Sequence, residues 1–251
     1  MAAAASLTGT QQTELWAVVA VETSGCGFLP DRRPQILFER HVFHRLTGGK
    51  YDDGDISDPI AGGYGSGGVH QYDRLAAAIA KDRTAALKSA SWGLGQIMGT
   101  NCVRAGFADV EAMVTATAAS EDDQLSAMGN FMRSTGLAVA LAAHDWTRFA
   151  RGYNGPNYAL NDYDQKLAHA YEAVAQNGPP DLQVRSVQLY LTYLGYSPGK
   201  IDGVLGPRTL AALRQFQIAN NLPIAPQISG VTVDQVSLAL PAIVFTTSVS
   251  G

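Results

Sequence analysis

The chain has 251 residues, of which 16% are charged and 46% are hydrophobic, and its formal net charge is −4. This balance excludes a disordered chain and a protein that coats nucleic acid, because both need much more charge. No apolar run approaches the roughly 18 residues of a membrane-spanning helix, so no membrane insertion is expected. The length fits one large domain or two unequal ones.

The first residues, MAAAASLTGTQQ, have neither the basic start nor the apolar core of a secretory signal, so synthesis in the cytoplasm is expected. Cys26 and Cys102 are the only cysteines, and cytoplasmic chains favour two buried free thiols over a disulfide. His41 and His44 stand near Glu39, but their spacing matches no zinc motif. We therefore expect no metal and no other cofactor.

From Gln12 onward the sequence predicts a helix with one apolar face. Leu15, Val18 and Val19 precede Glu22 at helical spacing, which places this carboxyl group at the end of the apolar face. Gly25 is expected to end the helix. Burial disfavours the carboxylate anion and raises its pKa, which suits a general acid that must hold a proton near neutral pH. A surface glutamate at a frayed helix end is the alternative.

Further along the chain the pattern predicts mainly helices, with at most a short irregular sheet near residues 34–60. The apolar run Ile36–Phe38 is typical of a short buried strand. Ser120 and Asp123 form a capping pair for a helix whose inward residues are Leu125, Met128 and Met132. Another inward stripe comprises Tyr163, Leu167, Ala170, Tyr171 and Val174.

A composition change at Asn177-Gly178-Pro179-Pro180 predicts a linker, because two prolines prevent the preceding helix from continuing. Up to position 181 there are 14 Lys+Arg and 20 Asp+Glu, giving −6, and beyond it 4 and 2, giving +2. We therefore expect one domain over residues 1–176, a linker over 177–182 and a second domain over 183–251.

The second domain is expected to be a three-helix bundle. In its first helix Val184, Val187, Leu191 and Leu194 form an apolar stripe, which Gly195 ends. About 60 residues bury only a small core, which suits a binding module better than an enzyme.

Pro207 suits the first turn of the second helix of this bundle. A third, shorter helix is expected to start at Thr232, with Gln235 as its capping partner, and to run towards Leu240. The inward face of the second helix is expected to comprise Leu210, Leu213 and Phe216.

This stretch resembles the peptidoglycan-binding domain 1 family, a three-helix module appended to many cell-wall hydrolases. The motifs that carry the resemblance are Val187-Gln188, Leu194-Gly195-Tyr196, Asp202 through Thr209, and Phe216-Gln217. The resemblance implies binding through Asp202, Gly203, Arg208 and Thr209. Alternatively, Asp202 and Gly203 merely shape a turn.

Residues 13–175 are similar to the N-acetylmuramidase family of phage endolysins, within the lysozyme-like superfamily that includes goose-type lysozyme and soluble lytic transglycosylases. The resemblance therefore implies a lysozyme-like, α-rich (α+β) catalytic domain. Several separate motifs match in order, namely Val21-Glu22-Thr23-Ser24-Gly25, Ile36 through His41, Gly62-Gly63-Tyr64, Ser91-Trp92-Gly93 with the following Leu94-Gly95-Gln96-Ile97-Met98, and Tyr153-Asn154-Gly155.

The resemblance implies that Glu22 protonates the glycosidic oxygen and that Tyr153 orients its carboxyl group by a hydrogen bond. Trp92 and Tyr153 offer stacking faces for sugar rings, although Trp92, like Leu94, Ile97 and Met98, can be read as core. Further substrate contacts are expected from Ser91, Gln96, Asn154 and Tyr64.

Glycoside hydrolysis usually needs a second carboxylate as base or nucleophile. We choose Glu39, because it follows a rigid strand and because the family has a glutamate in this Phe-Glu-Arg-His position. An ion pair with Arg40 or another basic neighbour is the alternative. The remaining candidates are Asp31 and a cluster that reads as a solvated loop beside the cleft, Asp52, Asp53, Asp55 and Asp58.

Two other patterns are weaker. Residues 63–68 satisfy G-x-G-x-x-G, but no strand leads into them, so a flexible glycine flap fits better than a dinucleotide site. A thiol nucleophile formed by Cys26 or Cys102 with His41 or His144 matches no family signature.

The sequence thus predicts a monomeric, two-module enzyme that binds peptidoglycan glycan strands and cleaves the bond between N-acetylmuramic acid and N-acetylglucosamine. A lytic transglycosylase, a wall-binding protein with an inactive cleft and a peptide-cleaving enzyme are the rivals. Action in the periplasm requires release by a holin or another route, and the sequence does not distinguish a phage lysin from a delivered antibacterial effector.

Overall fold

The structure, a computed structural model, describes residues 1–23, 26–51, 53–224 and 227–241. Within these ranges the N-terminal module, which ends at residue 177, is mainly helical, as predicted. Its α-helices are α1 (Ala2–Thr8), α2 (Gln12–Thr23), α3 (Arg40–Leu46), α4 (Val69–Ile79), α5 (Arg83–Lys88), α6 (Val110–Ala119), α7 (Glu121–Ser134), α8 (Leu137–Ala142), α9 (Trp146–Asn154) and α10 (Tyr163–Asn177). Two short 3₁₀ helices are η1 (Gly99–Asn101) and η2 (Tyr158–Asn161).

One small antiparallel sheet has the order β1 (Ile36–Phe38), β2 (Ala90–Trp92), β3 (Ile97–Met98). Strand β1 has the predicted bounds. The expectation that the sheet is confined to residues 34–60 is wrong, because β2 and β3 lie outside that range. All three residues of β2 are buried, so this strand lacks the alternation that identifies a half-exposed strand in a sequence.

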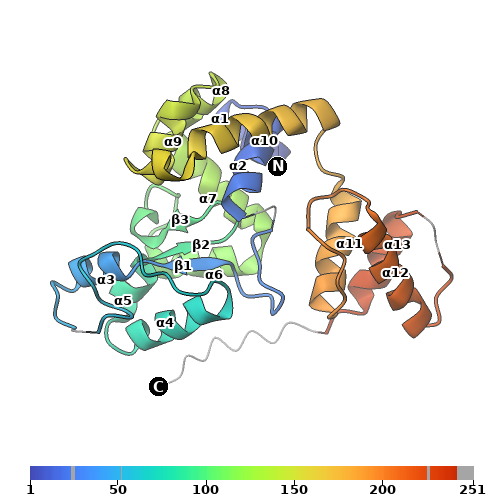
Figure 1. Cartoon of the computed structure of the whole chain (residues 1–251), viewed down its shortest axis with the longest axis horizontal. Helices are drawn as coiled ribbons and strands as arrows, with labels where there is room; N and C mark the ends of the chain where they lie inside the picture. Colours follow the sequence, from blue (N-terminus) through green and yellow to red (C-terminus); the bar gives the residue numbers. More distant parts are fainter. Residues whose placement is uncertain (24–25, 52, 225–226, 242–251) are drawn as a thin grey trace.

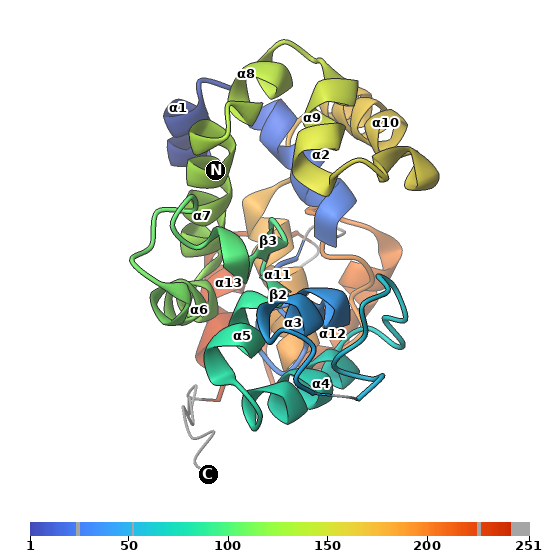
Figure 2. The same cartoon turned by 90° about the vertical axis from the view of Figure 1, so that its left-hand side faces the viewer.

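The sheet lies between two groups of helices. Figures 1 and 2 both show α8, α9 and α10 on one side of the sheet and α3, α4 and α5 on the other. Helix α10 packs along α2, and the hydroxyl of Thr23, the last residue of α2, donates to the Leu94 carbonyl at 3.4 Å, just beyond β2. The end of α2 and the end of the central strand are therefore joined.

Helix α2 confirms the predicted apolar face, because Leu15, Val18 and Val19 are completely buried. The position of Gly25, which was expected to end the helix, lies outside the described residues. Helix α7 begins where its capping pair predicts, since the Ser120 hydroxyl accepts the backbone N–H of Asp123. The inward residues predicted for α7 are buried as well, namely Leu125, Met128 and Met132.

The alanine-rich start of the chain forms α1, which packs on α7 with Ala4 and Ala5 buried. Cys26 and Cys102 are both buried and unbridged, as predicted. No helix within the described ranges is long and apolar enough to cross a bilayer.

The C-terminal module contains α11 (Leu182–Tyr193), α12 (Pro207–Ala219) and α13 (Gly230–Leu238) within the described residues. Asp181 caps α11 by accepting the backbone N–H groups of Gln183 and Val184. Gly195 follows α11 with φ 84°, the left-handed conformation that ends a helix. The core of this module comprises Val187, Leu191, Ala212, Leu213, Phe216 and Val236.

Two predicted details of this module are wrong. Leu210 is 37% exposed, and its place on the inward face of α12 is taken by Thr209, because two consecutive steps of three residues rotate away from a 3.6-residue repeat. Helix α13 begins at Gly230, not at Thr232, because Ser229 is the N-cap and Thr232 supplies the returning hydroxyl of the capping box.

Candidate active site

Glu22 lies in the last turn of α2, where its carboxyl group meets the ends of two other helices. The hydroxyl of Tyr163, the first residue of α10, donates to Glu22 Oε1. The side chain of Asn154, the last residue of α9, hydrogen-bonds both Glu22 and Tyr163. Burial raises the pKa of Glu22 to about 7, and the two hydrogen bonds oppose this rise. The group is therefore able to hold and release a proton near neutral pH.

Tyr153 does not make the hydrogen bond that we predicted to Glu22. Its hydroxyl donates to the Gly95 carbonyl at 2.6 Å, and its ring stacks on Phe149 with 5.1 Å between centroids. Burial, with the nearby Glu22 charge, raises the pKa of Tyr153 well above its usual range. Tyr163 makes the predicted contact instead. The sequence does not indicate that Tyr163 contacts Glu22, because its position fits the predicted apolar stripe of its helix equally well.

Gly93 to Gln96 form a tight turn that contacts Thr23, the residue after Glu22. Gly93 (φ 66°) and Gln96 (φ 46°) both have left-handed conformations. The Ser91 hydroxyl donates to Gln96 Oε1 at 2.8 Å, and Gln96 Nε2 donates to the Gly93 carbonyl at 2.8 Å. Ser91 is buried, so it holds Gln96 in place, and Gln96 is the more accessible of the two predicted substrate contacts.

Trp92 belongs to the core. Only 3% of its surface is exposed, and its indole N–H donates to the Leu87 carbonyl at 3.1 Å. A sugar ring cannot stack on a face that neighbouring side chains cover. This burial contradicts the predicted stacking role. The alternative is correct: Trp92, like Leu94 and Ile97, belongs to the core.

Glu39 lies at the junction of β1 and α3, as a residue that is partly buried and surrounded by polar groups. His41 Nδ1 lies 3.1 Å from Glu39 Oε2, and the Tyr64 hydroxyl hydrogen-bonds the same carboxyl group. Burial raises the pKa of Glu39, while His41 and Tyr64 oppose the rise. Of the basic neighbours that were the alternative explanation for Glu39, His41 does lie against its carboxyl group, whereas Arg40 binds Asp58 at 3.2 Å.

The segment that brings Tyr64 to Glu39 is held by two buried side chains of α4. Gln71 accepts the backbone N–H of Phe38 at 2.9 Å and donates to the Tyr64 and Ser66 carbonyls. Arg74 donates to the Tyr64 carbonyl at 2.9 Å and also binds Asp55. The glycine-rich segment is thus anchored through its backbone at the residues next to Glu39, so the predicted flap has a fixed base.

The aspartates of the acidic cluster that lie within the described residues, Asp53, Asp55 and Asp58, all make hydrogen bonds or ion pairs. Asp55 and Asp58 pair with Arg74 and Arg40, and Asp53 accepts the backbone N–H of Asp55. Asp52 lies outside the described residues. Asp31 pairs with Arg33 at the surface. These contacts assign the described aspartates to loop structure and leave Glu22 and Glu39 as the carboxyl groups whose pKa values burial raises.

Three of the four residues predicted for peptidoglycan binding, Asp202, Gly203 and Thr209, hydrogen-bond the side chain of Gln188 on α11. Gln188 Nε2 donates to Asp202, and Gln188 Oε1 accepts the Gly203 backbone N–H at 2.9 Å. Thr209 is 2% exposed and donates to the Pro198 carbonyl. Gly203 has φ 71°, and a side chain there would collide with the Asp181 backbone. Asp202, Gly203 and Thr209 therefore shape the loop, and Arg208 is the exposed member.

Replacing Tyr163 by phenylalanine is expected to lower the turnover number about tenfold and to move the basic limb of the pH–rate profile upward by about one unit. The hydroxyl donates to ionised Glu22 and lowers its pKa, so its removal raises that pKa further. The measurement is release of reducing ends from sacculi between pH 5 and 9. Tyr171→Phe on the same helix, which contacts His144 and Trp146 instead, is the control. An unchanged basic limb in Tyr163→Phe contradicts the assignment.

Comparisons with known proteins show the family to which the chain belongs. Residues 11–175 match the family model described as N-acetylmuramidase, and residues 180–225 match the model of the peptidoglycan-binding domain. A crystal structure of Burkholderia AP3 phage endolysin is similar, with a TM-score of 0.62 and 38% identity over 69% of this chain and 68% of that chain. No curated protein sequence matches significantly. The chain therefore belongs to the N-acetylmuramidase family of glycoside hydrolases and carries a peptidoglycan-binding domain after its catalytic module.

Proposed function

We propose that this enzyme hydrolyses the β-1,4 bond between N-acetylmuramic acid and N-acetylglucosamine, with Glu22 as general acid and Glu39 as general base. The observation that carries the proposal is the environment of Glu22, whose burial raises its pKa to about 7. A carboxylic acid with this pKa is still about half protonated at neutral pH and can give its proton to the leaving glycosidic oxygen. No cofactor enters the mechanism.

Glu39 completes the reaction as the group that accepts a proton from the attacking water. Burial raises its pKa, while His41 and the Tyr64 hydroxyl oppose this rise because both interact favourably with the carboxylate form. Two carboxyl groups in different environments are the usual arrangement for glycoside hydrolysis. The Gln71 and Arg74 contacts to the Tyr64 segment keep this second group in a fixed position.

The two modules have separate roles in this proposal. Residues 1–176 carry out the cleavage, and residues 183–251 bind peptidoglycan. The linker between them is shorter than the predicted 177–182, because Asn177 still belongs to α10 and Leu182 already belongs to α11. The likeness to a phage endolysin supports action on the bacterial wall after release from the compartment of synthesis. Tethering raises the effective concentration of glycan strands at the active site, because the second binding event is then intramolecular. The enzyme acts as a monomer.

Mass spectrometry of digested sacculi tests this proposal directly. Hydrolysis gives fragments with a reducing N-acetylmuramic acid at the end. A lytic transglycosylase gives 1,6-anhydro sugars instead, because the muramyl 6-hydroxyl replaces water. A peptide-cleaving enzyme produces new amino groups and no new reducing ends. Reducing muramic acid is the expected product, and anhydro products would overturn the role of Glu39 while retaining that of Glu22.

A further inference from the structure

The loop of residues 26–35, which the structure describes beyond the end of α2, is held at Gly27 by the start of α7. The backbone N–H of Gly27 donates to Glu121 Oε1 at 2.9 Å. One turn later on α7, Gln124 Oε1 accepts the backbone N–H of Leu94 at 2.7 Å, and any side chain at Gly27 would collide with Gln124. The first turn of α7 therefore fixes both loop 26–35, at Gly27, and the turn that follows β2, at Leu94.

Glu121 also forms an ion pair with the C-terminal module. Arg185 of α11 donates to both carboxylate oxygens of Glu121, at 2.6 and 2.8 Å. The side chain of Arg185 is only 9% exposed, and its guanidinium lies 5.8 Å from the ring centroid of Trp16 on α2, the helix that carries Glu22. One carboxylate thus joins α11 to the Gly27 backbone.

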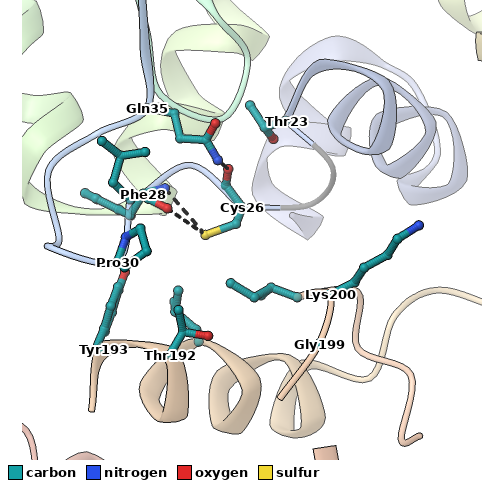
Figure 3. A pocket seen from close by; sticks show the side chains of 12 residues that line it. Thr23, Cys26, Phe28, Pro30, Gln35, Thr192, Tyr193, Gly199 and Lys200 are labelled. Atoms are coloured by element: carbon teal, nitrogen blue, oxygen red, sulfur yellow. Dashed lines mark hydrogen bonds between the residues drawn. The ribbon is translucent and has the colours of Figure 1, made fainter. Parts of the chain in front are cut away.

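A second contact joins the C-terminal module to loop 26–35 at Arg32. The guanidinium of Arg32 lies 5.1 Å from the ring centroid of Tyr193, and Arg32 also donates to the Pro241 carbonyl at 2.9 Å. Between the two contacts lies a pocket of about 240 Å³, with Cys26 and Phe28 facing Thr192 and Tyr193 across it (Figure 3). Loop 26–35 is therefore linked to the C-terminal module through Glu121 at Gly27 and directly at Arg32, and the pocket lies between these two points.

We propose that Arg185 and Glu121 are positioning residues, through which the C-terminal module sets the geometry of loop 26–35, four residues beyond Glu22, and so contributes to turnover as well as to anchoring. The inference rests on the proposed function. A bidentate, largely buried ion pair is effective only when its geometry is maintained, so this pair transmits the position of α11 to the Gly27 backbone. Small displacements of a general acid have large effects on rate.

The test uses Arg185→Met in the full chain, with a soluble, peptide-free oligosaccharide of alternating N-acetylglucosamine and N-acetylmuramic acid. Such a substrate is cleaved without being anchored to a sacculus. We expect kcat to fall about tenfold with KM nearly unchanged, and hydrogen exchange to increase in peptides covering residues 26–35. Arg214→Met removes the same charge from an exposed position of the same module and should change neither quantity.

Each outcome decides the proposal. If Arg185→Met cleaves the oligosaccharide as the parent does and loses activity only on sacculi, the module is an anchor alone and the proposal is wrong. If the parent itself does not cleave the oligosaccharide, the proposed function fails instead. Should Arg185→Met not fold by circular dichroism, Arg185→Lys replaces it, and a single remaining hydrogen bond should give a smaller fall in kcat. The double variant Arg185→Met, Glu121→Gln is expected to lose no more activity than the stronger single variant.

Discussion

Replacement of Glu22 by glutamine is expected to reduce cleavage of purified sacculi by about a hundredfold to ten-thousandfold, the range that general acid catalysis contributes. Glutamine keeps the size of the side chain and its hydrogen bond from Tyr163, but it has no proton to give to the glycosidic oxygen. The loss should appear in kcat rather than in binding. The measurements are release of reducing ends and loss of turbidity in permeabilised Gram-negative cells.

The same variant should be more stable than the parent at high pH. Burial raises the pKa of Glu22 from 4.5 to about 7, so the parent loses stability as pH rises from about 4.5 through 7, where the buried group must ionise. At 1.36 kcal/mol per pH unit, the free energy of unfolding of Glu22→Gln should gain up to about 3 kcal/mol on the parent between pH 4 and pH 8. Urea unfolding at the two pH values measures this difference.

Glu172→Gln, an exposed substitution on α10, is the matched control for both measurements and should behave as the parent does. Sedimentation with sacculi should be the same for all three proteins, because the C-terminal module is unaltered. Persistent cleavage by Glu22→Gln would remove this residue from the mechanism. A stability difference that does not change with pH would contradict its raised pKa.

Replacement of Glu39 by alanine is expected to reduce hydrolysis about a hundredfold or more, because water is then no longer deprotonated as it attacks. Azide is a nucleophile that needs no base, so adding it should restore cleavage and give glycosyl azide products detectable by mass spectrometry. Glu39→Gln should show the same loss with less change in shape. His41 and the Tyr64 hydroxyl, which now contact this carboxyl group, remain in both variants.

Asp73→Asn, an exposed acidic residue on α4, controls for the lost negative charge and should leave cleavage unchanged. Full activity of Glu39→Gln with anhydro products would identify a transglycosylase. Full activity with reducing products would mean that another group activates water. Either result removes Glu39 from the role of general base.

Features that depend on neighbours in the sequence were predictable from the sequence. The spacing of Leu15, Val18 and Val19 determines which face of α2 is buried, and that face carries Glu22 to its position. The capping pair at Ser120 locates the start of α7. The family resemblance pointed to Glu39 in its Phe-Glu-Arg-His motif, and the structure gives that carboxyl group a raised pKa.

Contacts between distant segments were not predictable. Tyr163 is 141 positions from Glu22, and a tyrosine in an apolar stripe has the same pattern whether its hydroxyl meets solvent or a carboxyl group. Trp92 was given a stacking role, because a motif does not show which side of a short buried strand faces the core. Gln71 had no local signal at all, since its three hydrogen bonds join β1 to the segment that carries Tyr64.

The carboxylate of Glu121, shared between Gly27 and Arg185, has a consequence for recombination among wall-degrading enzymes. Modules joined by an inert tether can be exchanged freely between chains. Here an exchanged partner lacking an arginine at this helical position leaves an acidic side chain without its cation beside the loop that follows Glu22. Gene shuffling should therefore transfer this pair of residues together, and an engineered chimaera should retain both or neither.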